Sequence, residues 1–366
     1  MKNMKVFANW KKLDKNFREK TVNYGIVLVA FLVIQILSAT GSLKNSISGQ
    51  LVPICTYVVM AISLNLVVGF LGELSLGHAG FMSLGAFSGT LFWVLNCETL
   101  PRPVALIAAF LIGGVVAGIF GFIIGIPVLR LRGDYLAIVT LAFGEIIKTV
   151  LNALYLGLDS NGFHLSMKDT MSLGMEADGK VLINGAIGIT GISKASSFVI
   201  GIVLVLITLF VVMNLVDSRA GRAIKSIRDN RIAAESIGIP ITKYKMMAFI
   251  TSAVLAGMAG VLYALNYSTL VAKKFDYNTS ILVLVFVVLG GMGNIRGSII
   301  AATVLTILPE LLRSVADYRM LVYAILLIAM MIFTQSPKAI AWRAVMVEKI
   351  KARRPGKGKI KQGEEG

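Results

Sequence analysis

The chain has 366 residues, of which 56% are hydrophobic and 15% are charged, and its mean hydropathy is +0.80. A soluble protein carries about 25% charged residues, so this composition excludes a soluble globular chain. The net charge of +17 would suit nucleic-acid binding, but a multi-pass membrane protein retains Lys and Arg on its cytoplasmic side and accounts for the same excess. We therefore expect contact with membrane lipid and none with nucleic acid.

Apolar segments long enough to cross a bilayer recur along the whole chain. Such segments span as helices, because only a helix satisfies its own backbone hydrogen bonds in hydrocarbon. The segments are residues 23–40, 50–69, 74–96, 104–127, 134–155, 197–216, 246–267, 279–293, 296–312 and 320–336. The sequence therefore predicts an all-α integral membrane protein of about ten transmembrane helices.

The basic residues predict the orientation of these helices. With the amino terminus inside, most Lys and Arg residues lie on cytoplasmic segments, which is the arrangement that membranes favour. We expect a basic cytoplasmic amino terminus at 1–22, a transmembrane permease domain at 23–336 and a basic cytoplasmic tail at 337–366. The first apolar segment is too long for the core of a signal peptide, so we expect it to remain as a helix.

Two segments are unusually rich in glycine. Gly77 and Gly85 interrupt the third apolar segment, and the cluster from Gly290 to Gly297 interrupts the eighth and ninth. They predict broken or re-entrant helices, with tight helix packing through small residues as the alternative. Interrupted helices at matching places in two halves are typical of a transport site, and 50–155 would pair with 246–336 as inverted repeats. The residues predicted for the path or gate are Ser75, Gly77, His78, Gly80, Gly85, Glu145, Gly290, Gly291, Gly293 and Gly297.

Glu145 and Lys148 are charged residues inside the fifth apolar segment. A charge at bilayer depth costs about 3 kcal/mol unless it is paired. Their i, i+3 spacing predicts a mutual ion pair on one helix face. The alternative is a carboxylate that carries protons in an ion-coupled transporter.

Residues 217–245 form a basic loop between two apolar segments. Asp217 or Ser218 can cap a helix, apolar residues recur at steps of three and four, and Gly238 and Pro240 end the pattern. One interpretation is an amphipathic helix that lies on lipid headgroups. The other is a helix that docks into a groove of a soluble subunit.

The mixture of acidic and amide side chains among the arginines favours docking, because anionic lipid alone would not select it. The predicted docking residues are Arg222, Ala223, Ile224, Arg228, Asp229, Asn230, Ala233, Ala234, Glu235 and Gly238.

Signs of chemistry within the chain are weak. No segment matches the G-x-x-x-x-G-K-[ST] phosphate-binding loop, and His78 and His164 lie in different regions without a cluster of metal ligands. Cys55 and Cys97 are expected to be free thiols more often than a disulfide. We therefore predict no catalytic residue, no metal and no cofactor bound by this chain.

Four runs of sequence resemble the M-type subunit of the high-affinity branched-chain amino acid ABC permeases. They are 72–87, 129–147, 222–260 and 289–297. The wider importer motif E-A-A-x-x-x-G is present from Ile232 to Gly238, with Ile232 in place of the acidic residue and Glu235 after the two alanines.

The resemblance implies a set of partners. It predicts a homologous second permease, two cytosolic ATP-binding subunits that carry ATP and Mg²⁺, and an extracytoplasmic substrate-binding protein. The 217–245 loop would couple to the ATPases, and the outer segment 156–196 would receive the binding protein, with a solvated connector containing a short helix as the alternative.

The resemblance also implies a location and a cargo. The location is a bacterial or archaeal plasma (inner) membrane, with both termini in the cytoplasm, and the cargo is leucine, isoleucine and valine. Another small solute, such as an amide, a sugar or a different amino acid, and an ion-coupled secondary transporter remain the alternatives.

Overall fold

The computed structural model describes residues 22–25, 27–35, 45–131, 133–175 and 179–312, and the single positions 321, 324, 325, 328 and 332. The chain divides into two compact units, Met1–Glu310 and Leu311–Gly366. Nearly all of the predicted amino-terminal segment, most of the predicted last span and the whole predicted tail lie outside the described residues. The helices and strands with defined bounds belong to the first unit, and the last of them ends at its boundary.

Within the described residues, six helices are long and apolar enough to cross a membrane. They are α2 (Asn45–Asn65) with the π-helix η1 (Leu66–Leu71) that continues it, α3 (His78–Asn96), α4 (Arg102–Val128), α5 (Asp134–Ala153), α6 (Phe198–Asp217) and α9 (Ile241–Ala264). The predicted spans 279–293 and 296–312 correspond to the shorter helices α10 (Tyr277–Gly290) and α11 (Ile295–Leu311). An apolar helix over Val22–Gln35 overlaps the first predicted span. The prediction of a mainly helical membrane protein is confirmed.

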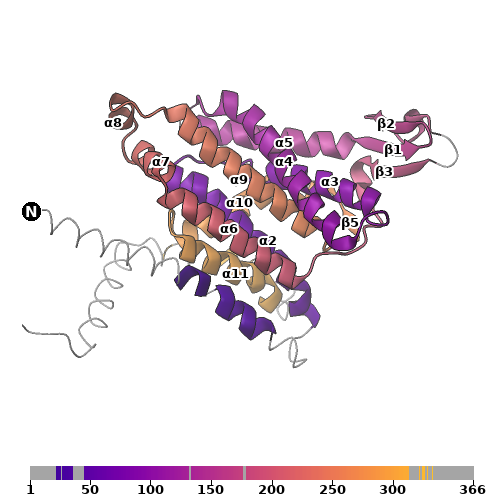
Figure 1. Cartoon of the computed structure of the whole chain (residues 1–366), viewed down its shortest axis with the longest axis horizontal. Helices are drawn as coiled ribbons and strands as arrows, with labels where there is room; N and C mark the ends of the chain where they lie inside the picture. The colour runs from indigo at the N-terminus through magenta and orange to yellow at the C-terminus, as the bar shows by residue number, and fades with distance from the viewer. Residues whose placement is uncertain are drawn as a thin grey trace, which may run out of the picture. The chain divides into compact units, whose positions relative to one another are not determined.

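The core of the bundle forms around α9, which packs against α2, α3 and α4 (Figure 1). Small residues allow this close approach: a Cβ atom at Gly85 of α3 would overlap the carbonyl oxygen of Gly257 of α9, and one at Gly260 would overlap that of Met82. Small residues are the usual means by which helices approach in a membrane, where no hydrophobic force drives them together. The prediction that Gly85 interrupts its span is wrong, because α3 runs through it without a break.

A small antiparallel sheet follows α5. Its strands are β1 (Tyr155–Asp159), β2 (Gly162–Ser166) and β3 (Lys180–Asn184), in the order β2-β1-β3, with Leu156 opposite Leu165 and Ile183. Two shorter strands, β4 (Ile189–Thr190) and β5 (Thr269–Leu270), pair with each other. The prediction of an all-α chain is therefore wrong here. Beside its strands the connector has two short 3-10 helices, η2 (Met171–Leu173) and η3 (Gly185–Ile187). The alternation of side chains in Gly162–Ser166 fits a strand rather than a helix.

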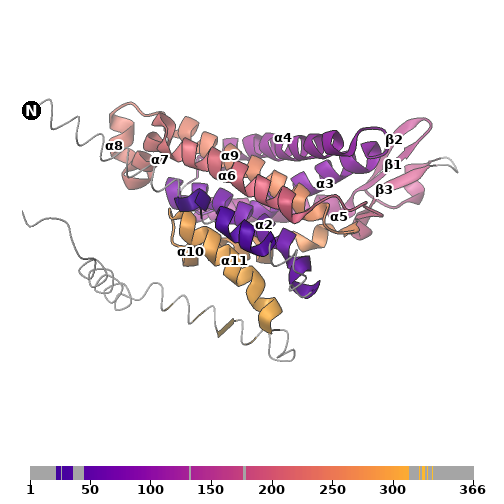
Figure 2. The same cartoon turned by 60° about the horizontal axis from the view of Figure 1, so that its bottom comes forward.

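The sheet and the 217–245 loop lie at opposite ends of the helical bundle. Figures 1 and 2 show β1, β2 and β3 at one end and the loop helices α7 (Arg219–Asp229) and α8 (Arg231–Ser236) at the other. We call these the sheet end and the loop end. The helices between them carry large exposed apolar side chains, such as Ile107, Leu111 and Phe210, which is what a lipid-facing surface requires.

Candidate functional site

The loop between α6 and α9 folds into two helices rather than the single predicted one. The Ser218 side chain caps α7 by accepting the Gly221 backbone N–H at 3.1 Å. Asn230 then leaves helical geometry and caps α8 by accepting the Ala233 N–H at 3.0 Å. The apolar periodicity of the loop does not reveal this break, and the one signal for it is that Asn is a favoured helix cap. Gly238, with a positive φ of 81°, ends the structure at the predicted place.

The predicted docking residues divide between two faces of α7 and α8. Ile224 and Ala234 are buried against the bundle, and Ala223 is half-buried. The exposed members are Arg222, Arg228, Asp229, Asn230, Ala233, Glu235 and Gly238. Two isoleucines join this exposed surface although neither was predicted there: Ile232 is 82% exposed and Ile237 is 74% exposed. Their position in the importer motif was the one signal that could have identified them.

An ion pair joins two other segments at the loop end. Glu73, just after η1, accepts from the ammonium group of Lys245 in the second turn of α9. The Lys245 side chain is only 2% exposed. Sequence reasoning missed this pair, because Lys245 follows other charged residues and suggests a solvated helix start.

The first glycine-rich segment leads into a buried polar junction at the start of α3. The Leu76 backbone N–H donates to Thr140 Oγ1 of α5 at 3.0 Å, and the Ala79 N–H donates to Ser280 Oγ of α10 at 3.0 Å. The buried His78 ring lies 2.8 Å from Ser63 Oγ of α2, measured from Nε2. Four helices therefore meet around the amino-terminal end of α3.

The other path residues predicted in this segment take part in the same junction. Ser75 is buried, and its hydroxyl has no hydrogen-bond partner among the described residues. A Cβ atom at Gly77 would overlap the Thr140 carbonyl oxygen, and one at Gly80 would lie 2.9 Å from Gly144 Cα. Gly77 and Gly80 therefore allow α3 to pack directly on α5.

The second glycine-rich segment forms the turn between α10 and α11. Gly290 and Gly297 are so close that a Cβ atom on either would overlap the backbone of the other. Gly291 and Gly293 have positive φ angles of 90° and 79°, which favour glycine. The four predicted glycines of this cluster therefore make one tight turn at the loop end.

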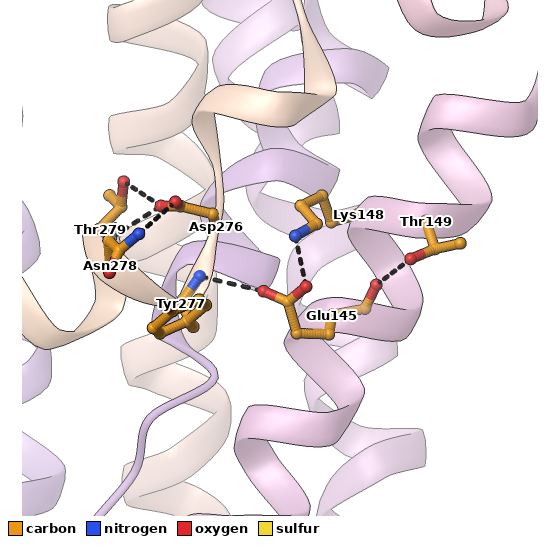
Figure 3. Close-up of polar contacts among 7 residues, drawn as sticks. All are labelled: Glu145, Lys148, Thr149, Asp276, Tyr277, Asn278 and Thr279. Carbon is orange, nitrogen blue, oxygen red and sulfur yellow. Dashed lines mark hydrogen bonds and ion pairs between the residues drawn. The ribbon is translucent and has the colours of Figure 1, made fainter.

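Glu145 lies about 16 Å along α5, near the middle of the span. Its carboxylate accepts the Tyr277 backbone N–H at 3.0 Å and forms an ion pair with Lys148, as Figure 3 shows. The predicted i, i+3 pair is therefore present. The Glu145 and Lys148 side chains are 32% and 22% exposed, so the pair lies at an open surface of the bundle.

Asp276 adds a third charge beside this pair. Its carboxylate caps α10 by accepting from the Thr279 N–H at 3.0 Å and the Asn278 side-chain amide at 2.8 Å (Figure 3). Partial burial acts to raise the pKa of Asp276, but these hydrogen bonds and the nearby Lys148 charge outweigh it and lower the pKa below its ordinary value. The site thus presents two carboxylates and one ammonium group at the start of a helix of 14 residues.

The sequence matches the family model described as the branched-chain amino acid transport system permease component over residues 46–334. This range contains α7, α8 and both glycine-rich segments. The chain belongs to this permease family. The resemblance that the motifs predicted is confirmed, and a permease of this family is a translocation component rather than an enzyme.

Curated relatives support the assignment to the branched-chain amino acid permease family. The permease LivM of Salmonella typhimurium is 34% identical over 331 residues, which are 86% of this chain and 74% of that protein. LivM of Escherichia coli is 35% identical over 335 residues, with the same coverage. A fructose import permease, FruG of Bifidobacterium longum, is 30% identical over 126 residues, or 33% of this chain and 37% of that protein. No solved structure matches the chain.

Proposed function

We propose that this chain is the M-type membrane subunit of an ATP-driven importer that moves leucine, isoleucine and valine into the cytoplasm. The observation that carries the proposal is the similarity to two LivM permeases over 86% of the chain. A sugar is the second cargo considered, because FruG is similar to one third of the chain. The much longer alignment with LivM favours amino acids.

The proposed architecture has about ten helices, both termini in the cytoplasm and the loop end facing the cytosol. It places the chain in a bacterial or archaeal plasma membrane. Helix α10 has 14 residues and extends only about 21 Å, whereas a bilayer core is about 30 Å thick. Helices α10 and α11 would therefore be two parts of a broken transmembrane segment. Residues 50–155 and 246–336 would form inverted repeats around the path.

Coupling to two cytosolic ATP-binding subunits would occur through α7 and α8. Ile232 and Ile237 are highly exposed, and the charged residues Arg222, Asp229 and Glu235 are exposed on the same two-helix loop. Exposed apolar side chains among charges of both signs suit a groove on a soluble protein, in which the isoleucines are buried and the charges fix the orientation. ATP and Mg²⁺ would be held by those subunits, and this chain would bind no cofactor.

The translocation path would run from the sheet end to the loop end, beside a homologous second permease. The junction of Ser75 and His78 provides buried polar side chains within the bundle, and the Glu145 group provides charged ones at its open surface. Polar residues at membrane depth generally face a path or a protein partner rather than lipid. Ions are not the proposed driving force, because Glu145 is already engaged by Lys148 and Tyr277.

An extracytoplasmic substrate-binding protein would dock at the sheet end. Strand β2 presents Phe163 and Leu165 on one exposed face, Met167 follows it with similar exposure, and Met171 is almost fully exposed. A cluster of exposed apolar side chains on a rigid sheet is typical of a protein contact. This docking would deliver the amino acid to the outer mouth of the path.

The test is purification of the chain from its native membrane, followed by reconstitution of whatever proteins accompany it. The proposal expects a second permease and nucleotide-binding subunits in stoichiometric amounts. It also expects ATP-dependent uptake of labelled leucine that excess isoleucine or valine inhibits and fructose does not. Recovery of the chain alone, with uptake driven by an ion gradient and not by ATP, would replace this proposal by an ion-coupled carrier.

A further inference from the structure

Two segments separated by more than two hundred residues meet at the loop end. Gly69, within η1, lies against Gly293 in the turn between α10 and α11, and a Cβ atom on Gly69 would overlap the Gly293 backbone nitrogen. The glycine at 69 is thus needed for a backbone-to-backbone contact. The π-helix η1 and the second glycine-rich segment are therefore joined directly.

Asn65 clamps this contact with both ends of its side-chain amide. Its Oδ1 atom accepts the Gly293 N–H at 2.8 Å, and its Nδ2 group donates to Ser298 Oγ of α11 at 3.0 Å. Asn65 and Ser298 are fully buried. Hydrogen bonds of buried polar groups are strong because water does not compete, and breaking one leaves an unsatisfied group. Movement of Asn65 must therefore move the turn and the start of α11.

Arg228 connects the same place to α7. Its guanidinium Nη1 donates to the Gly69 carbonyl oxygen at 3.0 Å, while Nε and Nη2 hold the adjacent Asp229. The arginine stem also packs on Gly72, where a Cβ atom would lie 2.6 Å from Arg228 Cγ. This side chain, which was predicted to contact another subunit, is directed in part at its own bundle. It is the link from the loop helix to η1.

The element between Arg228 and Asn65 is a π-helix, Leu66–Leu71. π-helical turns are rare and short, and they often occur at functional sites. Gly69 is near the end of this helix, where the last carbonyl oxygens have no donor within the helix, so its carbonyl oxygen can accept the bond from Arg228.

We propose that Arg228 is a positioning residue that transmits the displacement of α7 to η1, and through Asn65 to the Gly291–Asn294 turn. The inference rests on the proposed docking of α7 and α8 to ATP-binding subunits. When those subunits move α7, the Arg228 bond moves the Gly69 carbonyl, and the Asn65 amide carries the shift to α11. The η1 turn and the second glycine-rich segment, both at the loop end, then change together.

The test uses the complete complex of permeases, ATP-binding subunits and binding protein in proteoliposomes. Arg228→Met keeps the packing of the stem and removes the donor, and Arg228→Lys restores one donor. Arg102→Met is the matched control, because Arg102 is an exposed arginine at the start of α4, outside the 217–245 loop, and no polar contact of its side chain is found among the described residues. Uptake of labelled leucine and hydrolysis of ATP are measured on the same preparations.

The relay predicts that Arg228→Met keeps the ATP-binding subunits and their hydrolysis but lowers the leucine transported per ATP by about tenfold, within the usual range of coupling between sites. Arg228→Lys should recover much of this ratio, and Arg102→Met should leave it unchanged. A residue with a merely structural role would lower assembly, hydrolysis and uptake in parallel.

Asn65→Ser provides the second arm, since serine keeps one donor and one acceptor but is too short to bridge Gly293 and Ser298. If Arg228 and Asn65 act in one chain of contacts, the double variant Arg228→Met with Asn65→Ser should transport no less leucine per ATP than the more impaired single variant. If the Asn65→Ser complex does not assemble, the relay is tested by comparing the leucine transported per ATP in Arg228→Met and Arg228→Lys.

Two outcomes overturn the relay and leave the proposed function standing. One is an unchanged transport ratio in Arg228→Met. The other is loss of the ATP-binding subunits from that variant, which would make Arg228 a docking contact only. Absence of those subunits from the wild-type complex would instead refute the proposed function itself.

Discussion

The Lys245 ammonium group is almost fully buried and forms an ion pair with the Glu73 carboxylate, which comes from a segment 172 residues earlier in the chain. The pair joins the end of η1 to the start of α9. Both of these elements contact α7. An opposite charge is what allows a lysine to be buried at this position.

Removing one partner of this pair should therefore cost more than removing both. Lys245→Met leaves the Glu73 carboxylate without its cation and should lower the free energy of unfolding by about 3 kcal/mol. The double variant with Glu73→Gln should regain most of the lost free energy of unfolding, because no charge then remains unpaired. Thermal unfolding of the purified chain in detergent measures both. An equal decrease in the free energy of unfolding of the single and the double variant would show that Lys245 stabilises the fold by packing and not by its charge.

The contact between Gly85 and Gly257 predicts an effect of added volume. Gly85→Ala places a methyl group on the Gly257 carbonyl oxygen, so α3 and α9 must separate, at a cost of about 1–3 kcal/mol. Gly49→Ala is the control, because it lies in α2 with no atom near the added methyl group, and alanine should stabilise a helix there by about 0.5–1 kcal/mol. The same thermal measurement compares them, and a neutral Gly85→Ala would contradict the packing.

The spans and the family motifs were predictable because each consists of consecutive residues. Six predicted apolar segments correspond to helices of spanning length, with ends that differ by a few residues. Hydrocarbon imposes length and hydrophobicity on each segment separately, so local composition is enough. The importer motif likewise lies in consecutive residues, from Ile232 to Gly238.

The contacts that connect these segments were not predictable. Asn65 gave no signal, because its partners Gly293 and Ser298 come from the other half of the chain. The sheet at 155–184 was missed because its strands are short and pair across intervening residues. The break at Asn230 was missed because the amphipathic pattern continues across it.

Ile232 provides the sharpest test of docking at α7 and α8. It is highly exposed, so Ile232→Asp should not change the stability of the chain. It should prevent the ATP-binding subunits from remaining with the permease during purification, because an apolar contact would become a buried charge. Ile187→Asp, an exposed isoleucine near the sheet end, is the control and should retain those subunits. Normal retention in Ile232→Asp would place the docking surface elsewhere.

Glu145→Gln separates an ATP-driven importer from an ion-coupled carrier. Glutamine still accepts the Tyr277 N–H but leaves the Lys148 ammonium unpaired, which costs about 2–3 kcal/mol at membrane depth. We expect lower thermal stability and yield, with ATP-dependent uptake per assembled complex retained. Complete loss of uptake by a normally assembled complex, together with loss of any dependence on external pH, would favour the carrier.

Asp276 gives a prediction about pH. Its hydrogen bonds from Thr279 and Asn278 and the Lys148 charge outweigh burial and lower its pKa. A carboxylate whose folded pKa is depressed contributes stability above its ordinary pKa and loses it as the pH falls through the lowered value. Asn also caps helices but does not titrate, so Asp276→Asn isolates this contribution.

The melting temperatures of wild type and Asp276→Asn should therefore differ by a constant amount from pH 7 down to about pH 4, with the wild type more stable, because free Asp titrates near that pH. Below it the difference should shrink, since protonation removes the advantage of the charge at the start of α10. A difference that widens on acidification would mean that burial, rather than hydrogen bonding and Lys148, controls this carboxylate. The Asp276 carboxylate beside Glu145 would then not be fully ionised at the pH of transport.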